Sequence, residues 1–223
     1  MSKQFFTSLF IIACSAVFAQ ESQSPWFSQV NAAAYYAHRI ASTTDDLTQD
    51  ELNVFNDLEK GSFHSAYEIG VGRTMREHLA VSATLRLSKR GFQTDTLTDA
   101  SISIMRYGYT FVDFPIVVRS MFWDEEGWRP FVGVGANLSF LIADQTTYKR
   151  IGQTPWFEMP SSDAPNNFQF GIIASAGFTK RIQSLSSILL SLEYYQSVSP
   201  LYNGVLERRL NHLGLNVGFT RQF

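Results

Sequence analysis

Five charged residues lie within segments whose side chains otherwise alternate between apolar and small or polar. They are Glu68, Arg86, Asp113, Arg119 and Glu193, and each falls on the small or polar face of its segment. Charges that are enclosed together must pair, because an unpaired buried charge is costly. If these segments surround one narrow interior, we expect the five side chains to form an ionic network that fills it. A gated path for protons or ions through the same residues is the functional alternative.

Catalytic and metal-binding patterns are weak in this sequence. The histidines are His38, His64, His78 and His212. A nucleophile needs a base beside it, and only His64-Ser65 suggests such a pair. Neighbouring residues of a strand, however, point to opposite faces. No lipase-type motif is present, and no group of His, Cys and carboxylate residues has the spacing of metal ligands. We therefore expect no enzyme, no cofactor and no metal site.

The segments that must position these charges have a period of two. In the last one, Leu213, Leu215 and Val217 alternate with small or polar residues such as Gly214 and Asn216. Alternate side chains of a β-strand point to opposite faces, so each strand has an apolar face and a small or polar face. We predict eight such strands, at residues 26–37, 63–75, 79–94, 101–121, 128–143, 167–181, 187–197 and 208–223.

The connections between these strands alternate in length. The short ones are 76–78, 123–127 and 182–186, the long ones are 38–62, 144–166 and 198–207, and 95–100 is intermediate. Short turns at one end and long loops at the other are typical of outer-membrane barrels. We therefore predict an all-β fold, an eight-stranded antiparallel up-and-down transmembrane β-barrel. With the N-terminus in the periplasm, every long loop would face the cell exterior.

The overall composition resembles that of a soluble protein, with 45% hydrophobic and 17% charged residues and a net charge of −2. A membrane barrel has similar averages because apolar and polar residues alternate along its strands. A secreted soluble barrel that binds a ligand is the alternative, but it would place its charges outside. Here the second face is mostly Gly, Ser, Thr and Asn, which suits a narrow polar interior. The small net charge argues against nucleic acid as a partner.

Residues 1–19 have the pattern of a secretory signal peptide. Lys3 precedes an apolar run that ends in Val17-Phe18-Ala19, so we expect cleavage after Ala19 and a barrel domain at 20–223. The run is short for a retained membrane anchor. Lipidation of Cys14, the only cysteine of the chain, is a further alternative to cleavage after Ala19.

Aromatic residues gather near the predicted strand ends, as the two interfaces of a bilayer favour. The belt expected at the periplasmic ends contains Trp26, Phe122, Trp123, Trp128, Phe178, Phe219 and Phe223. The belt expected at the outer ends contains Tyr36, Tyr67, Phe92, Tyr107, Phe140, Phe168 and Tyr194. The long loop at 144–166 carries Trp156, Phe157, Met159 and Pro160, and exposed aromatic residues there would be candidates for contact with a protein partner.

Three motifs, taken in order, carry a family resemblance. They are Leu87-Ser88-Lys89-Arg90-Gly91-Phe92, Val112-Asp113-Phe114-Pro115-Ile116-Val117-Val118 and Arg129-Pro130-Phe131-Val132-Gly133-Val134-Gly135-Ala136. Their order and spacing resemble the PorT-like outer-membrane β-barrel family that is common in Bacteroidetes. Asp113 stands where that family often has Glu. The resemblance implies the fold and an outer-membrane location, and it leaves a role in type IX secretion open.

The terminal Phe223, with Phe219 on the same face, is similar to the C-terminal signal that barrel-assembly machinery reads, although Arg221 interrupts the pattern. Taken together, the sequence predicts an integral outer-membrane barrel with a plugged lumen and a structural or interaction role. Its predicted partners are the lipid bilayer, the assembly machinery during biogenesis, and proteins that contact the outer loops or form a secretion or surface assembly with it. The alternatives are a small channel or porin, a secreted ligand-binding barrel, and an outer-membrane enzyme that modifies lipids.

Overall fold

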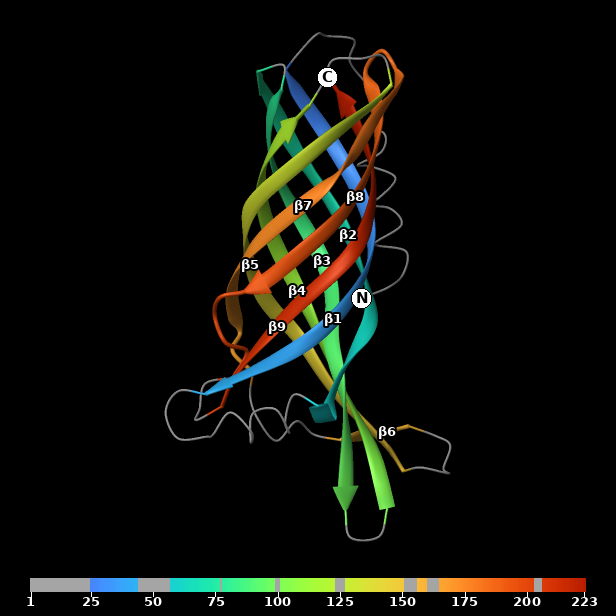
Figure 1. Cartoon of the computed structure of the whole chain (residues 1–223), viewed down its shortest axis with the longest axis vertical. Helices are drawn as coiled ribbons and strands as arrows, with labels where there is room; N and C mark the ends of the chain where they lie inside the picture. The colour runs from blue at the N-terminus through green and yellow to red at the C-terminus, as the bar shows by residue number, and fades with distance from the viewer. Residues whose placement is uncertain are drawn as a thin grey trace.

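The computed structural model describes residues 25–43, 57–76, 78–98, 101–122, 127–150, 156–159, 165–202 and 206–223. The predicted signal peptide, with Cys14, lies outside these residues. The described chain forms strands (Figure 1). They are β1 (Trp26–Thr43), β2 (Glu59–Arg76), β3 (Leu79–Thr98), β4 (Ser101–Met121), β5 (Trp128–Arg150), β6 (Phe157–Met159), β7 (Phe168–Gln183), β8 (Ser186–Ser197) and β9 (Leu206–Gln222). No helix among the described residues is long and apolar enough to cross a membrane.

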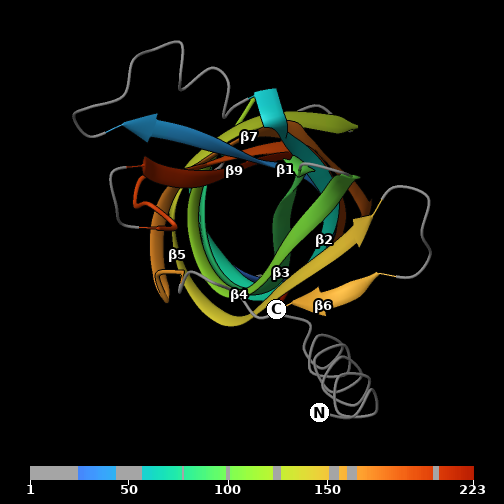
Figure 2. The same ribbon diagram turned by 90° about the horizontal axis from the view of Figure 1, so that it is seen from below.

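Eight of the strands close into a ring. Hydrogen bonding runs in the order β4-β3-β2-β1-β9-β8-β7-β5, and β4 also pairs with β5. All of these pairings are antiparallel, including that of β1 with β9. The end-on view shows the closed barrel (Figure 2). The predicted eight-stranded antiparallel barrel is therefore confirmed.

The predicted loop at 144–166 is wrong in part. β5 continues to Arg150, and the short strand β6 returns along it, with Phe157 opposite Tyr148 and Met159 opposite Thr146. β6 lies outside the ring (Figure 2). This hairpin forms because β5 extends past the last residue that pairs with β7, Phe140, and leaves backbone groups there that need partners.

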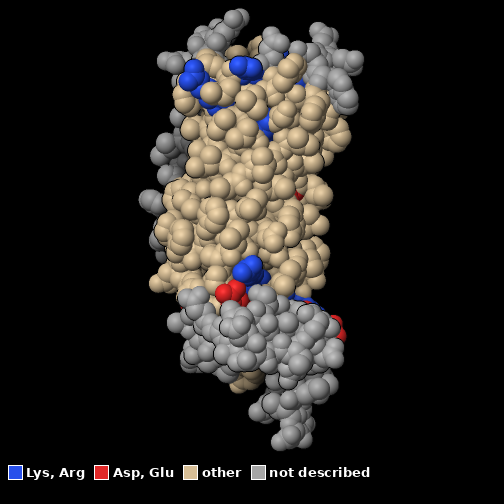
Figure 3. Space-filling view, turned by 60° about the vertical axis from the view of Figure 1, so that its left-hand side comes forward, with Lys and Arg blue, Asp and Glu red and all other residues tan. Residues whose placement is uncertain are grey.

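Exposure alternates along the strands as the sequence predicted. On β8, Leu190 and Leu192 are 40% and 48% exposed, whereas Leu189, Ser191 and Glu193 are 3–4% exposed. The outward side chains are apolar, and the inward ones are mainly small or polar. On the face shown in Figure 3, charged side chains lie near the two ends, and the band between them is almost free of charge. Such a band is what the hydrocarbon core of a bilayer requires.

The two ends of the barrel differ. The start of β1 and the end of β9 meet at one end, where the backbone N–H of Phe223 donates to the carbonyl oxygen of Trp26 at 3.2 Å; we call it the terminal end. At the opposite, loop end, β3, β4 and β5 extend past their neighbours (Figure 1). They are 20, 21 and 23 residues long, about twice what a tilted strand needs to cross a bilayer.

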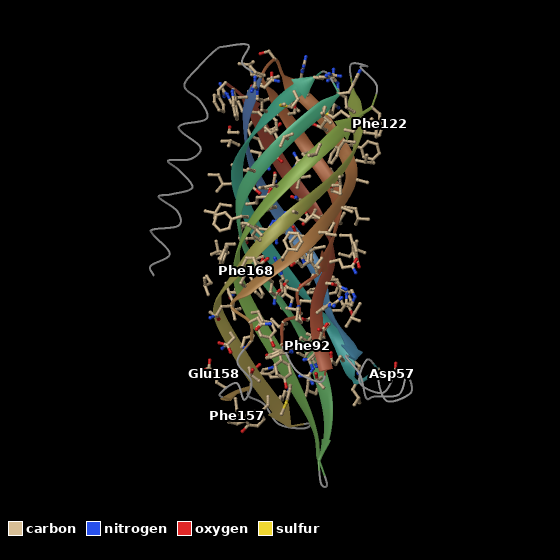
Figure 4. All side chains as sticks on the ribbon, turned by 90° about the vertical axis from the view of Figure 1, so that its left-hand side faces the viewer. Asp57, Phe92, Phe122, Phe157, Glu158 and Phe168 are labelled. Carbon is tan, nitrogen blue, oxygen red and sulfur yellow. The ribbon has the colours of Figure 1, made fainter. Side chains whose placement is uncertain are left out.

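Among the predicted belt residues, Phe92 and Tyr107 lie inside the loop end and not at the lipid surface, and Trp123 lies outside the described residues. Phe122 and Phe168 are 40% and 48% exposed, as expected, but Phe92 is 1% exposed and lies inside the loop end (Figure 4). The predictions for Phe92 and Tyr107 are therefore wrong. On β3, inward-facing residues have even numbers from Ala80 to Phe92, so the alternation itself places the Phe92 ring in the lumen.

Candidate functional site

Arg86 crosses the lumen and binds two carboxylates at once. Its two terminal nitrogens donate to the carboxylate oxygens of Glu193 at 2.6 and 2.9 Å. Its Nε donates to Oε2 of Glu68 at 2.7 Å. All three side chains are buried. The N–H donors of the planar guanidinium group thus find carboxylate oxygens in the geometry that they prefer.

Neutral amides extend this centre towards the terminal end. Oε1 of Glu68 accepts hydrogen bonds from Nδ2 of Asn31 at 2.6 Å and from Nε2 of Gln29 at 3.1 Å. Oε1 of Gln29 in turn accepts from Arg119 at 3.0 Å. Arg119 therefore reaches the network through an amide, whereas the sequence predicted that it would be part of an ionic network.

Aromatic rings and a histidine complete the other side of the centre. The hydroxyl of Tyr35 donates to Oε1 of Glu193 at 3.1 Å. The imidazole of His212 lies with Nε2 3.7 Å from the same oxygen. The His212 ring packs between the rings of Tyr35 and Tyr195, at centroid distances of 4.3 and 4.8 Å. These side chains leave little space around the carboxylate.

Asp113 belongs to a second cluster nearer the loop end. Its carboxylate pairs with Arg90 and accepts a hydrogen bond from the hydroxyl of Ser88 at 2.7 Å. The guanidinium of Arg90 also lies 4.6 Å from the centroid of the Tyr195 ring. Sequence reasoning missed Arg90, although its even number places it on the same face of β3 as Arg86.

An apolar cluster fills the lumen at the loop end. We call it the mouth cluster; its buried members are Phe92, Tyr109, Phe111, Leu201 and Leu210. Leu201 comes from the segment that follows β8, and its backbone N–H donates to the carbonyl oxygen of Arg208 at 2.6 Å. The hydroxyls of Tyr109 and Tyr202 lie 2.8 Å apart. The segment after β8 therefore folds into the barrel mouth.

Arg39 closes the mouth cluster from the side of β1. Its guanidinium lies 3.8 Å from the centroid of the Phe92 ring and pairs with the carboxylate of Glu59. The ring of Tyr107 also stacks on the Phe92 ring, with 4.6 Å between the ring centroids. A cation–π contact and an ion pair thus connect Arg39 both to the mouth cluster and to Glu59 on β2.

Comparison with known proteins identifies the family. A profile of the family described as "Outer membrane protein beta-barrel domain" matches residues 18–203. The chain belongs to this family. Among solved structures, OprG from Pseudomonas aeruginosa is 11% identical with a TM-score of 0.50, over 90% of this chain and 96% of that one. The Neisserial surface protein NspA is 11% identical with a TM-score of 0.49, over 91% of this chain and all of that one. A search of curated protein sequences finds no match.

As a member of the outer-membrane β-barrel family, the protein is an integral outer-membrane protein with the lipid bilayer around its strands. The predicted fold class and location are confirmed. The narrower resemblance to PorT-like barrels of Bacteroidetes stays a prediction.

One hydroxyl–imidazole contact in this family member was not predicted. Oγ of Ser62 lies 2.6 Å from Nε2 of His64, whereas the sequence suggested Ser65, which points the other way. A catalytic triad also needs a third group to orient the base. Within the described ranges, no hydrogen bond or ion pair joins a carboxylate to this imidazole, and no group of His, Cys, Asp and Glu could hold a metal ion.

Proposed function

We propose that this protein is a non-catalytic barrel with a closed lumen. It is anchored in the outer membrane and presents its loop end for contact with another protein. The observation that carries the proposal is the filled lumen. An eight-stranded barrel is only wide enough for its own side chains. Here Arg86, Arg90 and Leu201, which follow one another from the centre of the lumen to the loop end, are 2%, 1% and 0% exposed.

The three positions block passage for different reasons. At the centre, Arg86 on β3 and Glu193 on β8 form a hydrogen-bonded ion pair across the lumen. Nearer the loop end, Arg90 and Asp113 form a second ion pair. At the mouth, the segment that carries Leu201 closes the lumen with apolar side chains, which exclude ions and their hydration shells.

The loop end offers a surface for a partner. The ring of Trp156 lies 4.0 Å from the guanidinium of Arg106 and 6.0 Å from the ammonium of Lys149. Beside it on β6, Phe157 is 42% exposed and stacks on Tyr148 at 5.5 Å. Aromatic and arginine side chains of this kind are enriched where proteins bind one another. If the PorT-like resemblance holds, the partner belongs to a secretion or surface assembly.

Planar-bilayer recording of the refolded protein tests the closed lumen. We expect no stable single-channel steps for the wild type, with a general porin as the positive control. The variant Arg86→Ala/Arg90→Ala/Leu201→Ala removes a side chain at each blocked position and should raise the frequency of openings. Lys180→Gln, which changes a side chain outside the lumen, should stay silent. Stable steps in the wild type would instead support the small channel.

A further inference from the structure

Three buried polar side chains lie side by side on the inner face of β4, β5 and β7. Asp113 is opposite Ser139 in the register of β4 and β5, and Ser139 is opposite Gln169 in the register of β5 and β7. All three residues are 0% exposed. Opposite residues on one face of an antiparallel sheet have Cβ atoms about 5 Å apart. The side chains of these three residues are therefore within reach of one another.

Asn137 and Tyr195 border these side chains. Nδ2 of Asn137 donates to Oγ of Ser139 at 2.8 Å. Asn137 is also opposite Gly171 in the register of β5 and β7, and the ring of Tyr195 lies directly over Gly171. The guanidinium of Arg90 is 4.6 Å from the centroid of that ring. The side chains that meet here, which we call the polar row, are Arg90, Asp113, Asn137, Ser139, Gln169 and Tyr195.

Six atoms of the polar row have no hydrogen-bond partner among the described residues. They are Oδ1 of Asp113, Oδ1 of Asn137, both amide heteroatoms of Gln169, the hydroxyl oxygen of Tyr195 and Nε of Arg90. Buried polar atoms are nearly always hydrogen-bonded, because burial without a partner is costly. The set contains donors as well as acceptors. A ligand that satisfies all of them must therefore both donate and accept hydrogen bonds.

Charge and space define this ligand further. Arg90 and Asp113 already form an ion pair, so the charges of the polar row balance, and an added ion would leave a net charge in a buried site. An eight-stranded barrel is only wide enough for its own side chains to fill. These two facts favour a neutral ligand of the smallest size.

We propose that the polar row binds about two ordered water molecules. A buried water makes roughly three hydrogen bonds, so about two waters match the six unpartnered atoms. The waters bridge Gln169 and Asn137 to the Arg90–Asp113 pair and so connect β5 and β7 with β3 and β4. The Arg86 centre lies on one side of them and the mouth cluster on the other, which makes their exchange with bulk water slow. This site is separate from the loop-end surface and does not depend on a partner there.

NMR cross-relaxation between water and the refolded wild-type protein tests the site directly. In micelles of a deuterated detergent, the side-chain amide protons of Gln169 should give water cross-peaks with the signs of a bound water in the laboratory and rotating frames. Gln145, whose exposed amide donates to Oε1 of Glu158 at 2.7 Å, is the control. Its amide protons should show only contact with rapidly exchanging water.

Magnetic relaxation dispersion of oxygen-17 water counts the long-lived waters. Gln169→Leu should lower this count by about one, because two of the six atoms that hold the waters are lost. Gln145→Leu makes the same substitution at the exposed position and should leave the count unchanged. Gel migration with and without heating shows whether each variant is folded.

Two results would overturn the proposal. One is a Gln169 amide that shows no water cross-peak in the wild type, which would mean that its atoms bond directly to protein groups. The other is an equal count of long-lived waters in folded Gln169→Leu and Gln145→Leu. The first result needs no variant, so the test holds even if Gln169→Leu does not fold.

Discussion

Arg86 on β3 and Glu193 on β8 join opposite walls of the barrel through hydrogen bonds of 2.6 and 2.9 Å. In a ring of eight strands, β8 is four steps from β3 in either direction. The ion pair therefore spans the full width of the lumen. A bond between facing walls resists flattening of the barrel, which bonds between adjacent strands do not. It also makes the fold sensitive to a single side chain at its centre.

Replacement of Arg86 should be more destabilising than replacement of Glu193. Arg86→Met leaves both Glu68 and Glu193 without their cation, and breaking a buried pair in this way costs about 3–5 kcal/mol. Glu193→Gln leaves Arg86 bound to Glu68, so we expect a smaller loss. The measurement is the free energy of unfolding by urea in phospholipid vesicles.

The double variant Arg86→Met/Glu193→Gln should cost less than the sum of the single ones, because the glutamine carries no charge that needs a partner. Arg73→Met is the matched control. Arg73 faces outward and lies 5.5 Å from the ring of Trp26, so its loss should cost less than about 1 kcal/mol. Strict additivity would show that the Arg86–Glu193 pair contributes no coupling.

Gly171 is required by the ring that lies over it. A Cβ at this position would lie 2.6 Å from the carbonyl oxygen of Gln196 and even nearer to the Tyr195 ring. That ring cannot move away freely, since His212 stacks on it at 4.8 Å. We expect Gly171→Ala to reduce the free energy of unfolding by about 1–3 kcal/mol. Gly127→Ala is the control, because no described heavy atom lies within 4 Å of its added Cβ; equal losses would refute the steric explanation.

The period of two predicts most of this fold, because it reports directly which side chains face lipid. It assigns Glu68, Arg86 and Glu193 to one interior. The same alternation on β3, whose even-numbered residues point inward, would also have placed Arg90 and Phe92 in the lumen. To predict which charged side chains pair inside the lumen, the register between the strands must also be known. Arg86 lies opposite Asp113 in the β3–β4 register, yet Arg90 is the residue whose guanidinium reaches that carboxylate.

The closure of the mouth could not be predicted from the sequence. Leu201 and Tyr202 lie in a predicted long loop with no periodicity, and loop sequences do not reveal whether they fold inward. The extension of β5 and the strand β6 were missed for a related reason. Beyond the membrane, both faces of a strand meet water, so the alternation that marks a strand fades.

Cysteine labelling should show which end of the barrel faces the cell exterior. Val198, at the loop end, is 44% exposed, and Ser184, in the turn between β7 and β8, is also exposed. With the long loops outside, Val198→Cys should react with a membrane-impermeant maleimide on intact cells, and Ser184→Cys only after the outer membrane is permeabilised. The reverse order would show that the barrel has the opposite orientation.

Leu201→Cys, used in the same assay, tests the closed mouth. Leu201 is 0% exposed, so its thiol should react far more slowly than that of Val198→Cys, only three residues away. The protection should disappear in urea, which shows that the thiol itself is reactive. Equal labelling rates in folded protein would mean that the segment after β8 leaves the mouth much of the time and would count against the closed lumen.

A charge on the lipid face should be costly at mid-membrane and tolerated near the loop end. Leu215 on β9 and Ile142 on β5 both point outward and are both 58% exposed. Leu215 lies seven residues from the end of β9, Gln222, which places it near the bilayer centre, whereas Ile142 lies beyond Phe140. In vesicles, Leu215→Arg should reduce the free energy of unfolding by about 2–4 kcal/mol, and Ile142→Arg by about 0–1 kcal/mol. The two substitutions change equally exposed aliphatic residues in the same way, so their difference measures depth alone. Equal costs would place the membrane band elsewhere along the barrel.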